Sequence, residues 1–498
     1  MRRSRFPAIM TVALAGALLV GCAGPATSGF AWPTGTAPSP APVTASPTPT
    51  PAPATASVTA APTVTVLPTP TPMASTSPSP APTPSPTATP PAPARWVPAG
   101  TMKLARSYFA ALPLADGTVL VLGHDNTCTP GGANEDSVEA ELFDGTDAWA
   151  RTAPLNAPRD GFASVRLRDG RVLVTGGYTG VTATAGVLAY SSARIYDPQT
   201  RTWAKPGLMH VARYQPSATV LADGRVLVAG GVYADENSFD TRASAELFDP
   251  GTGKWSVTGS MKTARSAASA VTLDDGRVLV VGGVDSDGDP LRTAEVFDPD
   301  SGRWSSAGSL AKARAGFTLT LLPDGSVLAV GGDPGGSWAS DKPLASAERF
   351  DPSSGTWSPA ASMATPRTLH VAALLEDGTV LVAGGNDRAL VLPSGTSAVP
   401  GEPGGAIVFA SAPGDARVAL TPLNAFPPPT ASTEIYDPVT DSWSTAAPMA
   451  SRRAAASAVA LDDGSVLVIG GYGSWGQVST PYCPNELATA ERYLPAGG

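Results

Sequence analysis

The sequence predicts an all-β protein in which seven four-stranded sheets close into a ring, the seven-bladed β-propeller fold. Three observations predict it. The segment Asp275–Gly283, DGRVLVVGG, has six close copies elsewhere in the chain, a tryptophan recurs about every 50 residues, and the residues between these marks also repeat. A period near 50 residues, with four strand-like segments in each unit, is typical of propeller blades.

Each repeat contains four short strands in a fixed order. The first follows an arginine and is rich in Ala, Ser and Thr, the second is the apolar run after Asp-Gly, the third carries Phe or Tyr, and the fourth carries Trp. Small side chains suit the innermost strand because blades converge at the axis, whereas aromatic rings fill the wider outer wedge. The arginines are Arg106, Arg159, Arg213, Arg265, Arg314, Arg367 and Arg453.

Two kinds of tight turn join the strands of each repeat. Asp-Gly suits a hairpin between the first and second strands, and sequences such as DPGTGKW suit a turn between the third and fourth. Both turns therefore lie on one face of the ring. The loops of variable sequence, between the second and third strands and between successive repeats, share the opposite face, where we expect the functional site.

The tryptophans predict how the ring closes. Spacings of 54, 52, 49 and 53 residues separate Trp149, Trp203, Trp255, Trp304 and Trp357. No tryptophan follows Tyr493 in the last repeat, but Trp96 stands 53 residues before the first of this series. We therefore expect the strand around Trp96 to be the outer strand of the last blade, so that the two ends of the domain close the ring.

The repeat resembles the kelch repeat of the galactose-oxidase-like propeller superfamily, and the resemblance covers the chain from Trp96 onward. It implies a propeller over residues 95–498 and recognition of proteins or glycans. An insertion at about 386–432 lengthens blade six, because Trp357 and Trp443 are 86 residues apart. Within it, GAIVFASAPGDARVAL predicts a hairpin of two strands around a Pro-Gly-Asp turn.

The N-terminal segments predict export. Residues 1–21 combine three arginines with a short apolar run, which is typical of a signal peptide. Leu19-Val20-Gly21-Cys22 resembles the lipobox of bacterial lipoproteins, which implies lipidation of Cys22 and an anchor at the extracellular face of the bacterial cell membrane; an ordinary secretion signal is the alternative. Pro, Thr, Ser and Ala dominate residues 22–94, which predicts a disordered tether.

The predicted pairing of the two remaining cysteines depends on closure of the ring. Cys128 lies in the variable loop of blade one and Cys483 in that of blade seven. These loops are neighbours on one face if seven blades close, so we expect a disulfide between them in a secreted chain. Two free thiols are the alternative.

The charge of the chain argues against nucleic acid as a partner. The formal charge is −9, and the residues after Arg95 carry 29 basic and 42 acidic side chains. Such a surface repels phosphate backbones and anionic lipid. We expect a monomer that contacts the membrane only through its lipid anchor and binds a surface protein or a polysaccharide.

The seven arginines admit two interpretations. They could form a funnel that binds carboxylates or acidic sugars, or they could pair with a glutamate on the third strand of each blade. We favour the structural pairing, because a ligand seldom has seven-fold symmetry. The glutamates are Glu141, Glu246, Glu295, Glu348, Glu434 and Glu491, and blade two carries Arg194 instead.

Departures from the repeat mark the candidate binding residues. Trp338 and Trp475 lie in the variable loops of blades five and seven, where an indole could stack on a sugar, anchor a partner or pin its own loop. A polar pocket near the axis would instead support an enzyme. Its candidate members are Arg159, Asp160, Arg213, Tyr214, Gln215 and His370.

The three histidines, His124, His210 and His370, lack the spacing of a metal site. The resemblance also includes copper-radical sugar oxidases, which need two histidines and a cysteine cross-linked to tyrosine, but both cysteines of the propeller are assigned to a disulfide. We expect no metal, cofactor or catalytic residue. The predicted function is a cell-surface binding module; the alternative is a secreted carbohydrate-active enzyme, a sugar oxidase or sugar-acid epimerase.

Overall fold

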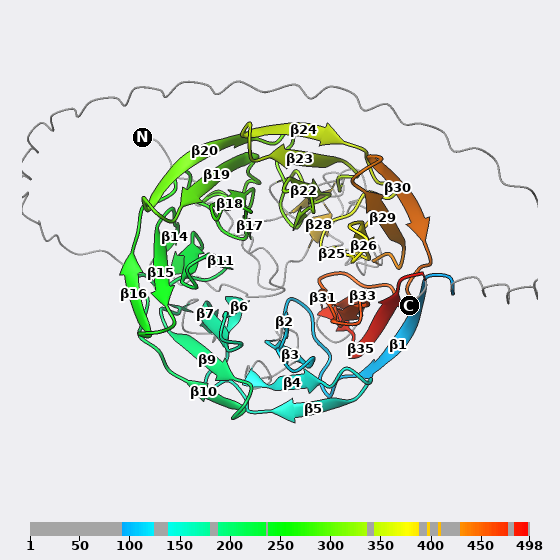
Figure 1. Ribbon diagram of the computed structural model, residues 1–498, viewed down its shortest axis with the longest axis horizontal. Helices are drawn as coiled ribbons and strands as arrows, with labels where there is room; N and C mark the ends of the chain where they lie inside the picture. The colour runs from blue at the N-terminus through cyan, green and yellow to red at the C-terminus, as the bar shows by residue number, and fades with distance from the viewer. Residues whose placement is uncertain are drawn as a thin grey trace, which may run out of the picture. The chain divides into compact units, whose positions relative to one another are not determined.

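The structure is a computed structural model that describes residues 92–123, 138–179, 188–235, 238–335, 343–387, 429–476 and 483–496, together with the backbone of residues 396–398 and 407–409. These residues form seven four-stranded antiparallel blades around a ring (Figure 1). The described part of the chain contains no α-helix, and so no helix that could cross a membrane. The predicted all-β, seven-bladed fold is confirmed. The expected signal peptide, and the expected tether up to residue 91, lie outside the described residues.

The strands of each blade run in order from the axis to the rim, where the fourth strands form the outer ring of Figure 1. Blade one contains β2 (Ala110–Pro113), β3 (Val119–Leu122), β4 (Ala140–Phe143) and β5 (Trp149–Thr152). Blade two contains β6 (Asp160–Arg166), β7 (Val172–Thr179), β9 (Ala193–Asp197) and β10 (Thr202–Ala204), with β8 (Leu188–Ala189) paired to β7. Blade three contains β11 (Ser217–Val220), β12 (Val226–Ala229), β15 (Ala245–Asp249) and β16 (Lys254–Val257).

The remaining blades repeat this order. Blade four contains β17 (Ser269–Thr272), β18 (Val278–Val281), β19 (Thr293–Asp298) and β20 (Arg303–Ser309). Blade five contains β21 (Thr318–Leu321), β22 (Val327–Val330), β23 (Ala347–Asp351) and β24 (Thr356–Ala360). Blade six contains β25 (Val371–Leu374), β26 (Val380–Ala383), β29 (Thr433–Asp437) and β30 (Ser442–Ala446). Blade seven contains β31 (Ser457–Ala460), β32 (Val466–Ile469), β35 (Thr489–Leu494) and β1 (Arg95–Thr101).

The core lies between neighbouring blades. The second strand of every blade is buried on both faces, which explains why its sequence is a continuous apolar run and not an alternating one. Leu227 of blade three, for example, belongs to the same buried cluster as Val280 and Phe297 of blade four. The hydrophobic repeat of the sequence therefore becomes a repeated interface between blades.

The ring closes as the tryptophan count predicts. Strand β1 pairs antiparallel with β35, which places Trp96 opposite Tyr493 with their ring centroids 5.2 Å apart. The two ends of the domain thus complete blade seven, and the predicted closure is confirmed.

Each blade tryptophan has two contacts. Its ring packs at 4.9–5.2 Å on the aromatic residue of the third strand, and its indole N–H donates to a backbone carbonyl of the preceding blade. Trp255 donates to the carbonyl of Gly207 at 2.9 Å, and Trp96 donates in the same way to Ala447 at 2.8 Å. The tryptophan period of the sequence is therefore the period of a contact that joins each blade to the one before it.

The glycine pair that ends the apolar run of the second strand, present in six blades and replaced by Gly123-His124 in blade one, is needed where two blades meet. Gly230 has a φ of 70°, and a Cβ at this position would lie 2.3 Å from the carbonyl oxygen of Arg265 in the next blade. The N–H of Gly231 donates to that same oxygen at 2.8 Å. A side chain at the first glycine would force the blades apart.

Among the described residues, three extra hairpins and the short strand β8 interrupt the repeats, always between the second and third strands of a blade. The hairpins pair β13 (Val232–Ala234) with β14 (Phe239–Thr241), β27 (Thr396–Ala398) with β28 (Ile407–Phe409), and β33 (Tyr472–Gly476) with β34 (Cys483–Glu486). In blade six, Ile407–Phe409 pairs with the upstream strand Thr396–Ala398, a pairing that the sequence did not predict. The predicted turn at Pro413-Gly414-Asp415 lies outside the described residues. The eight residues between β27 and β28 hold two prolines and three glycines, a stronger set of turn residues.

Candidate functional site

One face of the ring carries the variation between blades. Because the strands of a blade alternate in direction, the Asp-Gly and Asp-Pro turns all lie on one face, and the loops and extra hairpins lie on the other. We call the latter the variable-loop face. The arginine that begins each repeat lies at this face, in the loop that enters the innermost strand.

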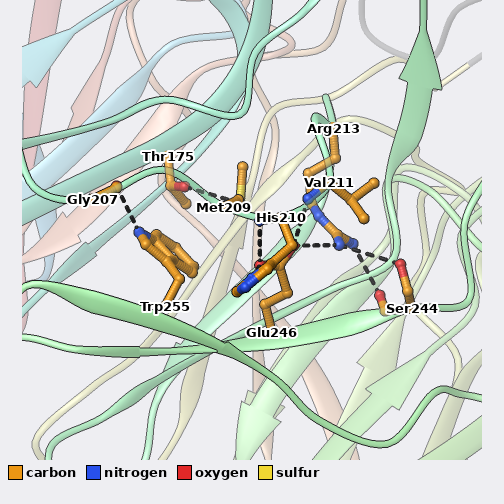
Figure 2. A network of polar contacts seen from close by, with 9 residues as sticks. All are labelled: Thr175, Gly207, Met209, His210, Val211, Arg213, Ser244, Glu246 and Trp255. Atoms are coloured by element: carbon orange, nitrogen blue, oxygen red, sulfur yellow. Dashed lines mark hydrogen bonds and ion pairs between the residues drawn. The ribbon is translucent and has the colours of Figure 1, made fainter.

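Figure 2 shows the contacts of this arginine in blade three. One terminal nitrogen of Arg213 donates to the carbonyls of Gly230 at 2.6 Å and Ser244 at 2.9 Å. The other donates to the hydroxyl of Ser244 and to Oε1 of Glu246, at 3.2 and 3.1 Å. The guanidinium is fully buried, so it holds the ends of the second and third strands together inside the protein.

The glutamate completes the network by accepting bonds from the entry loop. Oε2 of Glu246 accepts from the backbone N–H of His210 at 2.7 Å, and Oε1 accepts from that of Val211 at 3.0 Å. The imidazole of His210 also contacts Oε2 through Nδ1, at 2.9 Å. One carboxylate therefore joins the arginine, the third strand and the loop; we call this arrangement the arginine clamp.

Six blades form the clamp with a buried ion pair, which confirms the structural interpretation of the arginines. The pairs are Arg106–Glu141, Arg213–Glu246, Arg265–Glu295, Arg314–Glu348, Arg367–Glu434 and Arg453–Glu491, at 2.6–3.1 Å. Burial lowers the pKa of each of these arginines, while the carboxylate opposes that shift.

Blade two lacks the carboxylate. Arg159 is as buried as its counterparts and donates to the carbonyls of Gly176 and Ser192 and to the hydroxyl of Ser192, at 2.9–3.0 Å. At the glutamate position stands Arg194, whose terminal nitrogen donates to the carbonyl of Ala193 at 2.8 Å. The pKa of Arg159 falls to about 10, chiefly because the side chain is buried and further because Arg194 is positive. Blade two therefore holds two cations where the other blades hold an ion pair.

A ring of left-handed residues surrounds the axis on the same face. The second residue after every arginine has a φ between 50° and 60°; the seven are Tyr108, Gly161, Gln215, Ala267, Gly316, Leu369 and Ala455. Their backbones bond from blade to blade, as in the N–H of Leu369 donating to Gly316 and that of Ala455 donating to Leu369. Because every blade adopts this conformation, it belongs to the architecture of the inner ring. No residue type is common to all seven positions, so this ring could not be predicted from the repeat.

His370 is buried in a slot that other blades fill with phenylalanine. It is the third residue after its arginine, the position of Phe109, Phe162 and Phe317. Its ring packs over Gly331 of the preceding blade, and Nε2 contacts the hydroxyl of Thr318 at 3.0 Å. Burial, together with the charges of two nearby arginines, lowers its pKa to about 3. The imidazole is therefore neutral at physiological pH.

The other candidates near the axis gather between blades two and three. Tyr214 is buried, its ring centroid lies 5.2 Å from that of Tyr178, and burial raises its pKa to about 12. Asp160 is buried at the start of β6, and the side chain of Gln215 lies over Gly161. The structure thus brings Asp160, Tyr214 and Gln215 into one region, whereas His370 belongs to the contact between blades five and six.

Several predicted residues fall outside the described part of the chain. Trp338, Cys128 and His124 lie wholly outside it. Trp475 and Cys483 lie on β33 and β34, whose backbones pair, but their side chains are not among those described. The tryptophan sites and the disulfide therefore stay predictions.

The fold and the repeated clamp define a class of protein, the seven-bladed β-propeller assembled from one recurring unit. Within that class, residues 161–385 of the chain match the family described as the KLHDC2/KLHL20/DRC7 Kelch-repeats domain.

The chain is also similar to individual known proteins. The chain is 27% identical over 198 residues to alpha-scruin of Limulus polyphemus and 25% identical over 206 residues to Kelch-like protein 15 of Danio rerio. Each alignment covers 39% of this chain but 21% and 32% of the relatives, so the chain spans only a fifth to a third of their length. A fungal alcohol oxidase of the AA5 family, solved in complex with copper, superposes with a TM-score of 0.58 at 17% identity, over 81% of this chain and 76% of the oxidase. That likeness shows the fold alone.

Copper has no matching ligand set in the part of the chain that the structure describes. Within that part, no three His, Cys, Asp or Glu side chains lie close enough to hold a metal ion. His210 contacts Glu246 in the blade-three clamp, whereas His370 is buried against Thr318 at the inner strand of blade six. The two described histidines therefore do not converge, and no reaction step through a metal follows from this geometry.

Proposed function

We propose that this protein is a binding module that recognises a partner protein through the variable-loop face of its propeller. One observation carries the proposal: the structural differences between blades are concentrated on that face. The hairpins β13–β14, β27–β28 and β33–β34 all extend second-to-third-strand loops, whereas the opposite face repeats the same aspartate-capped turns. Loops carried on a rigid scaffold are where recognition residues concentrate.

The kelch-repeat match supports protein recognition as the default for this fold, although the fold by itself does not determine function. Carbohydrate recognition through Trp338 and Trp475 is the second candidate from the sequence. The experiment below tests the protein partner, because it detects protein adducts.

Site-specific photocrosslinking in the full chain tests the proposal. We would place a photoreactive amino acid at Asp240 of β14 or Asn485 of β34, which are exposed on the variable-loop face. The matched control is Val439, which is 92% exposed in the Asp-Pro turn of blade six on the opposite face. We expect a protein adduct from the first two positions and none from Val439. Equal adducts from all three positions, or an adduct from Val439 alone, would refute the proposed face.

We further propose that the module is displayed outside the cell by a lipid on Cys22, with residues 22–94 as the spacer. The support is the charged and apolar leader followed by Leu-Val-Gly-Cys. Metabolic labelling with an alkyne fatty acid should label the wild-type chain in the membrane fraction. Cys22→Ala should be unlabelled and soluble. A labelled Cys22→Ala, or an unlabelled wild type in the medium, would overturn this anchor without affecting the propeller.

A further inference from the structure

The six complete clamps show which chemical group fits the place beside Arg159, where blade two lacks the glutamate of the other blades. In each of them, one carboxylate oxygen accepts from the arginine and the other from the N–H of the third residue before it, as Glu295 accepts from Arg265 at 3.0 Å and from Lys262 at 2.7 Å. A planar group with two acceptor oxygens satisfies donors arranged in this way. The donors therefore specify a carboxylate.

Blade two keeps these donors and lacks the acceptor. The entry-loop residues that correspond to Lys262 and Thr263 are Asn156 and Ala157. Among the described residues, neither backbone N–H has a hydrogen-bond acceptor, and no carboxylate contacts Arg159. The blade-two loop outside the described part, residues 180–187, contains no Asp or Glu that could supply one.

The charges in blade two favour an anion. Arg159 is 1% exposed, and among the described residues no Asp or Glu contributes to its electrostatic environment. Arg194 adds a second positive charge at the position where the other blades have a negative one. The guanidinium of Arg159 lies 5.0 Å from the ring centroid of Tyr190 but has no counterion among the described residues. A buried cation without a counterion is unfavourable, so a bound carboxylate would be stabilised by both cations.

The entry-loop residues and Arg194 reach the surface on the face proposed for recognition. Asn156 is exposed, and Ala157 and Arg194 are half-buried, although the guanidinium of Arg159 is not exposed. A group that enters from the variable-loop face would meet Arg194 and the two N–H groups before it reaches Arg159.

We propose that blade two carries a recognition site for one carboxylate, in which an acidic side chain of a partner protein occupies the place that glutamate fills in the other six blades. The identity of the occupant rests on the function proposed above, but the carboxylate site does not. A glutamate side chain is the natural occupant, since six intramolecular glutamates already bind this set of donors.

Thermal unfolding of the full chain tests the site with acetate as the probe, at constant ionic strength and with acetamide as the neutral control. At tenfold excess over its Kd, acetate should raise the unfolding midpoint of the wild type by about 1–2 °C. Acetamide should not. Arg194→Glu supplies the missing carboxylate, so it should raise the midpoint without any additive and abolish the response to acetate.

A second variant keeps the test decisive if Arg194→Glu does not fold. Arg194→Gln removes the extra cation but leaves the donors open, so acetate should still stabilise it, at higher concentration than the wild type. The proposal is overturned if acetate and acetamide act alike on the wild type, or if Arg194→Glu folds and responds to acetate as the wild type does.

The source of the carboxylate is tested with capped tripeptides that contain a central Glu or Gln, and with glucuronate. We expect the Glu peptide to stabilise the wild type more than either of the others. A larger shift with glucuronate would overturn the protein source in favour of an acidic sugar. If acetate stabilises the wild type but not Arg194→Glu while photocrosslinking fails, the carboxylate site is supported and the proposed protein recognition is refuted.

Discussion

The clamp of blade four offers the sharpest test of how the propeller is held together. The carboxylate of Glu295 accepts three bonds: from Arg265 at 3.0 Å, from the N–H of Thr263 at 3.0 Å, and from the N–H of Lys262 at 2.7 Å. The glutamate is 4% and the arginine 1% exposed. Glu295→Ala removes all three bonds and leaves a buried guanidinium without its counterion.

The expected loss follows from these contacts. Breaking a buried ion pair by deleting one partner destabilises a protein by about 3–5 kcal/mol. The lower end applies here, because Arg265 keeps its bonds to the carbonyl and hydroxyl of Thr293, at 2.9 and 3.0 Å. Blade two also shows that the fold accommodates an arginine without a glutamate. We therefore expect Glu295→Ala to lower the free energy of unfolding by about 3 kcal/mol.

Urea unfolding of the full chain, followed by tryptophan fluorescence, measures this loss. Two controls separate its causes. Glu295→Gln keeps an acceptor oxygen and should lose less than the alanine variant. Glu295→Ala/Arg265→Met also removes the stranded charge, so it should recover at least about 1 kcal/mol relative to the single variant. A loss below about 1 kcal/mol for Glu295→Ala would refute the clamp as a stabilising unit. A double variant less stable than the single one would show that the bonds of Arg265 to Gly282 and Thr293 outweigh the cost of its unpaired charge.

Three further predictions concern single positions. His370→Phe should reduce the loss of unfolding free energy at acid pH. The histidine has a pKa near 6.5 in the unfolded chain and of about 3 in the folded one. The wild type therefore loses up to about 1.4 kcal/mol per pH unit as the pH falls between these two values. Equal slopes for both proteins in urea titrations at pH 7 and 4.5 would contradict this. Trp96→Ala should cost roughly 2 kcal/mol, as should Trp203→Ala in an internal blade, because each loses a ring contact and an indole hydrogen bond. If Trp96→Ala leaves the free energy of unfolding unchanged, Trp96 does not contribute to closing the ring. Peptide mapping without reductant should find Cys128 linked to Cys483; two free thiols would exclude the disulfide.

The sequence predicts the blades, their closure and the ion pairs because all three recur with one period. A contact that recurs from blade to blade leaves a copy of its residues in each of those blades, as the six Arg–Glu pairs do. A contact that occurs once leaves no such trace. The pairing of β28 with β27 was missed for this reason, since a three-residue strand between turn residues specifies its partner only weakly.

The left-handed backbone conformation near the axis also could not be predicted from the sequence. The left-handed ring at the axis includes Tyr, Gln, Leu, Ala and Gly at equivalent positions, so its conformation is set by the carbonyl of the neighbouring blade and not by the residue itself. The role of His370 needed the structure as well. Only the packing of its ring over Gly331 shows that it replaces a core phenylalanine.

Blade two connects stability with recognition. A propeller optimised for stability alone would carry a seventh glutamate, because the donors for it are already present in Arg159 and the entry loop. With Arg194 in place of a glutamate, blade two lacks the ion pair and has a second positive charge near Arg159. Both changes lower the stability of the isolated domain. Such a departure from the repeat is expected where function needs an unsatisfied site. Arg194→Glu therefore makes opposite predictions for the two properties: it should stabilise the propeller and weaken carboxylate binding at the same time, a combination that simple structural damage would not produce.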